Sequence, residues 1–389
     1  SGLVGSEMCI RDRRALALQA RKYPNVDMPT AITQIAGRQV AAEKIPSWRD
    51  TDDIWYPKHL SLEQCSSEVT ARYKATLLKG NSLTDLTGGF GIDCAFLAAR
   101  FKSATYVERQ QELCEIAAHN FPILNLNHIN VKNEDGVSYL QAMSPVDCIF
   151  LDPARRNEHG GKTVAISDCE PNVAEFEGLL LSKANRIMIK LSPMLDLSQA
   201  LKELPHTQEV HIISVNNECK ELLLLLGQTA PEEIPVHCVN LSTKGEQEKQ
   251  LFVFTREQEQ HSECSYTDTL GNYLYEPNAS LLKAGAFRSI AAAYSVKKLH
   301  PNSHLYTSDT QIEGFPGRTF RIINRCSLNK KEIKENLSDL KKANITVRNF
   351  PATVAELRKR IKLAEGGDTY LFASTLNDGQ KILIRCGKV

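Results

Sequence analysis

The sequence predicts an α/β protein whose largest domain is an open, mostly parallel sheet with helices on both faces. Strand-like and helical segments alternate from about residue 81 to residue 257, a pattern typical of βαβ units. A glycine-rich turn follows the first of these strands in the run LTDLTGGFGID, Leu83 to Asp93. Beyond residue 270 the order of segments changes to one expected of small α+β modules.

Length and composition exclude several classes of protein. The 389 residues are too many for one compact core of ordinary size, so several domains are expected. The 11 cysteines contain no C-x-x-C pair, which argues against a zinc ribbon or a disulfide framework. The longest apolar run, Leu222 to Leu226, is too short to span a bilayer. We therefore expect a cytoplasmic protein with no membrane segment.

The N-terminal part is predicted to be helical. Residues 1–13, SGLVGSEMCIRDR, resemble a translated sequencing-adapter tail and are set aside as an artefactual extension. From residue 14 to residue 78 apolar residues recur at spacings of three and four, which indicates helices. Gln64, Ser67 and Glu68 are candidates for the mouth of a ligand site, and simple packing on the next domain is the alternative.

The domain from residue 79 to residue 257 contains seven predicted strands, which alternate with helical segments. They are Leu83 to Thr87, Thr105 to Glu108, Asn130 to Lys132, Asp147 to Asp152, Arg186 to Leu191, Glu209 to Val215 and Lys220 to Leu226. Ligands of open parallel sheets bind beyond the carboxyl ends of the strands, so the residues at those ends are the site candidates.

The turn after the first strand indicates a nucleotide-type site. Gly88, Gly89 and Gly91 have no Cβ, so the backbone can come close to a ligand. The dinucleotide fingerprint G-x-G-x-x-G is incomplete, because Cys94 stands where its third glycine is expected, and this disfavours NAD. Asp85, just before the glycines, suits a ligand with a cationic amino-acid end, such as S-adenosylmethionine.

Further acidic residues stand at the ends of the next strands. Glu108 closes the second strand and can accept hydrogen bonds from ribose hydroxyls in either kind of nucleotide fold. Asp135 follows the third strand and can accept from an adenine amino group, although an ordinary turn acid before Gly136 fits equally well. Asp152 ends the fourth strand, and Pro153 stops the strand there, leaving the carboxylate at the edge of the sheet.

Taken together, these motifs resemble motifs I to IV of the class I S-adenosylmethionine-dependent methyltransferases. The runs SSEVTARYKA, LDPARR, LYEPNASLLKAG, KLHPNSHLYTSD and GGDTYLFAST further resemble a bacterial methyltransferase family with a THUMP-like C-terminal domain. The resemblance implies a Rossmann-like catalytic domain, a ferredoxin-like domain at residues 270–318 without iron, and a THUMP-like domain at residues 319–389. It implies a cofactor site made of Asp85, Thr87, Gly88, Gly89, Gly91, Glu108, Asp135 and Asp152, and catalytic roles for Asp152, Pro153 and Arg155.

The C-terminal part is basic. From Pro316 onward it holds 16 Lys and Arg against 7 Asp and Glu, whereas the rest holds 31 against 39. A basic module on an acidic body suggests a polyanionic partner such as RNA, with a solvated basic face as the alternative. The candidate phosphate contacts are Arg348, Arg358, Lys359, Arg360 and Lys362.

Two other C-terminal features, a polar stretch and a pair of histidines, do not indicate a functional site. The polar stretch Gln258 to Asp268 is the predicted linker between domains. His300 and His304 have the spacing of two metal ligands on one helix face, but Pro301 argues against a helix there. No metal site is therefore expected.

The loop from Asp152 to Arg155 leaves the methyl acceptor open. Enzymes that methylate an exocyclic amine pair the Asp with an aromatic residue that stacks on the base, and this loop has none, although Arg155 can stack by its guanidinium plane. Methylation of pyrimidine carbon 5 is disfavoured, because Ser192 stands where a cysteine nucleophile is wanted. Methylation of a ribose hydroxyl would use Asp152, Lys190 and either Glu218 or Glu221.

The sequence thus predicts an S-adenosylmethionine-dependent methyltransferase that acts on RNA. One alternative is an RNA-binding or assembly protein that keeps the cofactor without turnover. Another is a methyltransferase of proteins or small molecules, against which the basic C-terminal part counts. An NAD-dependent dehydrogenase is disfavoured. The acceptor atom and the oligomeric state stay open.

Overall fold

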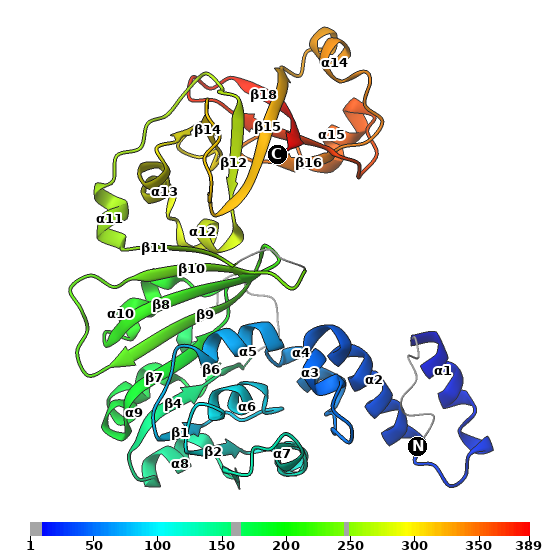
Figure 1. Ribbon diagram of the computed structural model, residues 1–389, viewed down its shortest axis with the longest axis vertical. Coiled ribbons are helices and arrows are strands. Elements are labelled where there is room, and N and C mark those ends of the chain that lie inside the picture. Colours follow the sequence, from blue (N-terminus) through cyan, green and yellow to red (C-terminus); the bar gives the residue numbers. More distant parts are fainter. Residues whose placement is uncertain (1–9, 157–164, 245–248) are drawn as a thin grey trace. The chain divides into compact units, whose positions relative to one another are not determined.

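A computed structural model describes residues 10–156, 165–244 and 249–389 (Figure 1). Residues 1–9 of the adapter-like segment lie outside the described residues. The chain divides into two compact units, each described by itself below. The first unit comprises Ser1–Val210 and Glu221–Glu232, and the second comprises His211–Lys220 and Glu233–Val389.

The predicted N-terminal helical region is confirmed. Its helices are α1 Ile10–Leu18, α2 Met28–Lys44, α3 Pro46–Arg49, α4 His59–Gln64 and α5 Glu68–Ala75, with a 3-10 turn η1 at Ala20–Lys22. Helix α2 begins after Asp27 and helix α5 begins after Ser67, and each of these side chains accepts a hydrogen bond from the backbone three residues on. These caps explain why the helices start where they do.

All seven predicted strands of the α/β domain are present. They lie in the order β8-β9-β7-β4-β1-β2-β3, with bounds β1 Ser82–Asp85, β2 Ser103–Glu108, β3 Ile129–Asn133, β4 Val146–Leu151, β7 Ala184–Leu191, β8 Thr207–Val215 and β9 Glu218–Gly227. Strands β1, β2, β3, β4 and β7 are parallel, whereas β9 is antiparallel to β7. Strands β8 and β9 contribute residues to both units.

The strand order reverses direction between β1 and β4. From β1 the chain proceeds outward through β2 and β3, and from β4 it proceeds the other way through β7. Such a switch point opens a crevice at the carboxyl ends of the two central strands. The fold therefore places the end of β1 and the end of β4 at the position where a ligand is expected.

Helices pack on this sheet and bury its apolar runs. They are α6 Ile92–Ala98, α7 Gln111–Ile123, α8 Gly136–Ala142, α9 Glu177–Lys183 and α10 Leu197–Glu203. Helices α6 and α7 contact β2, and α9 contacts β7. Every residue from Leu222 to Leu226 is fully buried, which explains this apolar run as a core strand. After β4 the short strand β5 Ala154–Arg155 pairs with β6 Cys169–Glu170. The 3-10 turn η2 Ile166–Asp168 comes just before β6, and the 3-10 turn η3 Val173–Phe176 comes after it.

The second unit begins with elements that the sequence did not predict. Strands β10 Val236–Leu241 and β11 Gln250–Phe254 form an antiparallel pair. Helix α11, Arg256–His261, occupies part of the stretch that was predicted to be a linker. The prediction failed there because the helix is polar throughout, and it is held by a capping box between Thr255 and Gln258.

The rest of the second unit is built on one seven-stranded sheet, in the order β13-β14-β12-β15-β18-β17-β16. Its strands are β12 Tyr273–Pro277, β13 Lys297–Lys298, β14 Tyr306–Ser308, β15 Gly317–Cys326, β16 Asn344–Val347, β17 Thr369–Thr375 and β18 Lys381–Lys388. Its helices are α12 Ala279–Ala284, α13 Phe287–Tyr294, α14 Lys330–Leu337 and α15 Val354–Ile361. The mixture of strands and helices after residue 318 matches the small α+β modules that the sequence predicted there.

This sheet joins the two C-terminal modules. Strand β12 pairs with β15 along its whole length, across residue 318. One hydrophobic cluster contains Leu274 and Leu305 from one side of that residue and Phe320 and Phe372 from the other. The sheet and its core are therefore continuous through the expected domain boundary. Within the ranges that the structure describes, no helix is long and apolar enough to cross a lipid bilayer.

Candidate functional site

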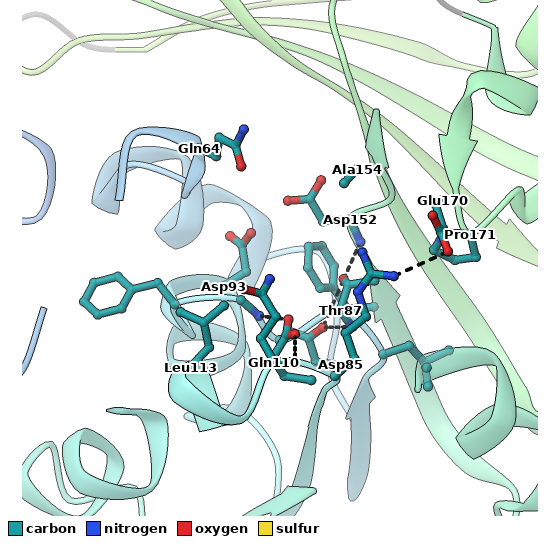
Figure 2. Close-up of a pocket in the computed structure, with 18 of the residues that line it drawn as sticks. Gln64, Asp85, Thr87, Asp93, Gln110, Leu113, Asp152, Ala154, Glu170 and Pro171 are labelled. Carbon is teal, nitrogen blue, oxygen red and sulfur yellow. Dashed lines mark hydrogen bonds and ion pairs between the residues drawn. The ribbon is translucent and has the colours of Figure 1, made fainter. Parts of the chain in front are cut away.

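A cavity of about 350 Å³ lies at the carboxyl ends of β1, β2 and β4 (Figure 2). This volume is in the range of sites for small molecules and cofactors. All the predicted cofactor residues line it, namely Asp85, Thr87, Gly88, Gly89, Gly91, Glu108, Asp135 and Asp152. The expectation that ligands bind at the carboxyl ends of the strands thus selected residues that are far apart in sequence but line one cavity.

The glycine turn packs against the side chain of Tyr106 in β2. The Tyr106 side chain is fully buried, and its hydroxyl donates a hydrogen bond to the carbonyl of Gly89. A Cβ on Gly88 would lie 2.2 Å from the Tyr106 ring, and Gly91 has a φ of 96°. Glycine is therefore required at position 88 by close approach and favoured at position 91 by backbone conformation.

Asp85 is the most unusual carboxyl group of the cavity. Its side chain is buried, and its Oδ1 accepts a hydrogen bond from the Thr87 backbone at 2.9 Å. This bond turns the chain, so β1 ends at Asp85 and not at Thr87 as predicted. The Oδ2 atom has no hydrogen-bond partner among the described residues. Burial raises the pKa of Asp85 well above its ordinary value. A buried, unpartnered oxygen at a cavity wall is the kind of group that a bound cation or N–H donor completes.

Glu108 and Asp135 already have hydrogen-bond partners in the protein. Glu108 accepts from the backbone of Gly89 at 3.1 Å and from the backbone of Gln110 at 2.8 Å, so it holds the glycine turn against the end of β2. Asp135 accepts from the Ser138 backbone at 3.0 Å and is the N-cap of helix α8. The turn role that the sequence left open for Asp135 is therefore present, and its place on the cavity wall remains compatible with a ligand contact.

Asp152 follows β4 directly and faces the same cavity. Its backbone N–H donates to Thr87 Oγ1 at 2.7 Å, which links the end of β4 to the glycine turn. Its carboxylate Oδ2 lies 3.2 Å from Lys190 Nζ. Pro153 and Arg155 are not among the lining residues, whereas Ala154 and Arg156 are.

The residues proposed for the mouth of the site have different positions. Gln64 lines the cavity, and Figure 2 shows it above Asp93 and Asp152. Ser67 caps helix α5. Glu68 accepts hydrogen bonds from Ser47 and pairs with Arg72 at 3.0 Å. Of the three residues, only Gln64 is therefore placed to touch a ligand.

Alternating charges connect two points of the cavity wall through the core. We call them the buried charge chain: Asp152, Lys190, Glu221, Lys74 and Asp93. Lys190 Nζ lies 3.6 Å from Glu221 Oε1, and Lys74 contacts the same oxygen. Lys74 Nζ lies 2.8 Å from Asp93 Oδ1. The Lys74 and Glu221 side chains are 0% and 4% exposed, so this pairing is shielded from water.

Ser66 joins this chain at Asp93, and both residues line the cavity. Its hydroxyl accepts a hydrogen bond from Lys74 at 2.7 Å and donates one to Asp93 Oδ2 at 2.7 Å. Sequence reasoning missed Ser66, Lys74 and Asp93. Asp93 lies within the glycine-turn run and lines the cavity, so its sequence position was an available signal. Ser66 and Lys74 both lie in the run SSEVTARYKA, which carries the family resemblance but did not indicate a role for either residue.

The charges of the chain influence one another. Burial would raise the pKa of Asp93, but Lys74 and Lys190 outweigh it, so this pKa lies below its ordinary value. Burial would lower the pKa of Lys190, but Asp152 and Glu221 outweigh it and raise this pKa above its ordinary value. Burial raises the pKa of Asp152, and Lys190 opposes the rise. Lys190 is therefore held as an ammonium, and Asp152 binds a proton more readily than an ordinary aspartate does.

His300 and His304 are not on a helix, as expected from Pro301; they flank a turn at residues 301–303. The His304 ring stacks on Phe287 with a centroid distance of 3.7 Å.

Family profiles match three parts of the chain. Residues 44–157 match "Protein-L-isoaspartate(D-aspartate) O-methyltransferase (PCMT)". Residues 273–316 match a ferredoxin-like domain, and residues 317–388 match a "THUMP domain-like" profile. No curated protein matches the chain.

Solved structures provide a relative over nearly the whole chain. A "putative methyltransferase" from Porphyromonas gingivalis W83 is 35% identical, with a TM-score of 0.86, over 99% of this chain and 100% of that one. An "rRNA Methylase" from Streptococcus thermophilus is 15% identical over 41% of this chain and 94% of that one, with a TM-score of 0.30. A Streptococcus mutans protein "in complex with SAH" is 14% identical over 42% of this chain and 97% of that one, with a TM-score of 0.31.

Proposed function

The chain belongs to the family of the Porphyromonas gingivalis protein, a methyltransferase domain followed by ferredoxin-like and THUMP-like domains, and from this premise we propose that it is an S-adenosylmethionine-dependent methyltransferase of RNA. The observation that carries the choice of cofactor is the Oδ2 of Asp85 beside the glycine turn, which has no hydrogen-bond partner in the described parts of the chain. The ammonium group of the methionine part would complete it.

The cavity residues fit this cofactor in position and type. Asp85 and the turn from Gly88 to Gly91 would hold the methionine part, Glu108 the ribose and Asp135 the adenine amino group. Both oxygens of Glu108 already accept backbone hydrogen bonds, but a carboxylate oxygen can accept a second one. The bound cofactor would supply an electrophilic methyl group on a sulfonium.

RNA as the substrate rests on the C-terminal module. The match to a THUMP-like profile supports it, as do exposed basic residues on and after helix α15. Lys359, Arg360 and Lys362 are exposed and suit phosphate contacts. Arg348 is paired with the buried Glu276 at 3.2 Å and is a weaker candidate for this role. The cytoplasmic location and the domain boundaries stay predictions.

A protein carboxyl group is the second candidate acceptor. The match of residues 44–157 to a profile named for isoaspartyl O-methyl transfer favours it. Salt distinguishes the two substrates, because binding to RNA phosphates weakens steeply as salt rises, whereas a local protein contact responds less. An RNA-binding protein without turnover is the third candidate.

Calorimetric titration with S-adenosylhomocysteine tests the cofactor. We expect binding to the wild-type protein and a clear loss of affinity in Glu108→Ala, because that change removes the carboxylate from the cavity wall. The matched control is Glu134→Ala, a neighbouring exposed acid that does not line the cavity. Absence of binding to the wild type would refute the proposal. Methyl transfer to total RNA by Asp152→Ala at the wild-type rate would instead favour chemistry elsewhere.

A further inference from the structure

We infer that the methyl acceptor is a hydroxyl oxygen, the ribose hydroxyl of an RNA nucleotide, and that Asp152 takes its proton while the ammonium of Lys190 stabilises the oxygen. The inference rests on the proposed function, since it names the acceptor within the same site. It comes from the buried charge chain, which the cofactor site itself does not explain.

The buried charge chain has one more negatively charged group than positively charged groups. Three carboxylates, those of Asp93, Glu221 and Asp152, face the ammonium groups of Lys74 and Lys190. A proton received by Asp152 makes this set neutral, whereas a proton lost by Lys190 would leave two uncompensated charges in a largely buried place. Within these five groups the charge count therefore favours Asp152 as the base and Lys190 as a cation.

A fixed cation beside Asp152 discriminates between acceptors. An amine becomes positively charged as it takes a methyl group, so the ammonium of Lys190 at 3.2 Å from Asp152 would repel it. A hydroxyl develops negative charge as its proton leaves, and the same ammonium stabilises that charge. The electrostatics of the site thus favours an oxygen acceptor over the exocyclic amine of a base.

The buried part of the chain fixes the position of Lys190. Its ammonium pairs with Glu221 of β9, which is held by Lys74 of α5, which in turn pairs with Asp93 of α6. Because Lys74 is 0% exposed, it touches no substrate and acts as a positioning residue. Lys190 itself is 13% exposed and is not among the lining residues of the cavity, whereas Asp152, with which it pairs, lines the cavity, so the ammonium acts on the acceptor oxygen through its charge from behind Asp152.

The reaction balances with the groups named. The hydroxyl proton passes to Asp152, and the oxygen uses the freed electron pair to form the new carbon–oxygen bond. The carbon–sulfur bond of the donor breaks, and its pair returns to sulfur, giving a neutral thioether and a methyl ether. The proton then leaves Asp152 for solvent. Arg156, exposed on the same cavity wall, suits the phosphate next to the ribose.

Alkaline hydrolysis of the labelled product tests the acceptor. The wild-type protein is incubated with total RNA from a strain lacking this gene and with S-adenosylmethionine carrying a labelled methyl group. Methylation of a ribose 2′-hydroxyl blocks alkaline cleavage of the next phosphodiester, so we expect the label in alkali-resistant dinucleotides. Label in mononucleotides would mean base methylation and overturn the inference, while the proposed function would stand.

The other outcomes separate the inference from the function on which it rests. Label in added protein and not in RNA would overturn both the ribose acceptor and the RNA substrate. No label anywhere, with S-adenosylhomocysteine still bound, would also overturn both. No binding of S-adenosylhomocysteine would overturn the proposed function at its first step.

Variants of Lys190 test its role directly. Lys190→Met is expected to lower kcat by about 10²–10³-fold, as loss of a group that stabilises a developing oxyanion does, with S-adenosylhomocysteine affinity unchanged. Its acid limb in the pH–rate profile should move to higher pH, because Lys190 holds the pKa of Asp152 down. Lys202→Met, an exposed lysine on α10, is the matched control. Wild-type kcat in Lys190→Met would overturn the inference.

One further readout does not depend on activity, and another does not depend on the folding of Lys190→Met. Carbon-13 NMR of aspartate carboxyls in the unliganded protein, with Asp152→Asn as the assignment variant, should show a higher Asp152 pKa in Lys190→Met. If Lys190→Met does not fold, Lys190→Arg keeps the cation and should retain more activity than Asp152→Asn. An unchanged Asp152 pKa, or Lys190→Arg as inactive as Asp152→Asn, would count against the pairing.

Discussion

At the scale of single residues, Asp85 combines burial with an oxygen that lacks a partner among the described residues. In the empty protein burial raises its pKa, so it holds a proton over part of the pH range in which an exposed aspartate is ionised. A ligand ammonium would favour the ionised form. Binding should therefore expel a proton from Asp85.

The affinity for S-adenosylhomocysteine is accordingly expected to rise with pH up to the pKa of Asp85 in the empty protein and then to level. Asp85→Asn should bind more weakly and lose this slope, because the amide cannot ionise. Calorimetry at several pH values below the pKa of the ligand amine measures this pH dependence of the affinity in both proteins. An equal slope in wild type and Asp85→Asn would assign the proton to another group.

Asp85→Asn is also expected to affect the stability of the folded protein. A carboxyl group whose pKa is raised by folding costs stability as the pH rises above its unfolded value. Asp85→Asn removes that cost, so at neutral pH the variant is expected to unfold at a urea concentration no lower than the wild type does. This result would show that its weaker ligand binding is not caused by misfolding.

At the scale of elements, the turn between β1 and α6 depends on the ring beneath it. Gly88→Ala would drive a Cβ into Tyr106 and is expected to lower the free energy of unfolding by about 1–3 kcal/mol. Gly178→Ala in α9 is the matched control, because nothing lies within 4 Å of its Cβ. That control should be neutral or slightly stabilising, and urea unfolding of both variants gives the comparison. Similar losses in both would contradict the close packing of the turn.

The buried charge chain ties α5, α6 and β9 together. Lys74→Met removes the ammonium beside Asp93 and leaves Glu221 with Lys190 alone, and it is expected to cost about 3–5 kcal/mol of unfolding free energy. Lys79→Met, an exposed lysine four residues after the end of α5, should change stability by less than about 0.5 kcal/mol. Chemical denaturation measures both. A loss in Lys74→Met as small as in Lys79→Met would mean that the chain contributes little to stability.

Elements and site residues differ in how well the sequence predicts them. The seven sheet strands follow from the alternation of strand-like and helical segments, and Asp85, Glu108 and Asp152 follow from the rule that ligands bind at strand ends. Helix α11 was taken for a linker because it has no apolar face. Lys74 was missed because its contacts are not local, since its partner Glu221 lies 147 positions away in the sequence.

At the scale of the whole molecule, the charge asymmetry predicts salt-dependent binding of RNA. Changing Lys359 and Lys362 to Gln should weaken binding to total RNA and reduce the slope of log affinity against log salt by about 1.4, if each contacts one phosphate. Filter binding at several salt concentrations measures the slope. Lys102→Gln, an exposed lysine outside the basic module, is the control. An unchanged slope in the double variant would place the RNA contacts elsewhere.

The continuous sheet of the second unit limits how the protein can be cut or recombined. Removing residues 319–389 would take away most of β15, leaving β12 as a bare edge and stripping Phe320 and Phe372 from Leu274 and Leu305. An exposed edge with an apolar face recruits other chains, so such a truncate is expected to aggregate. The two C-terminal modules therefore form one folding unit. A fusion protein that contains only one of them would have to supply the strands that the other module contributes to the sheet.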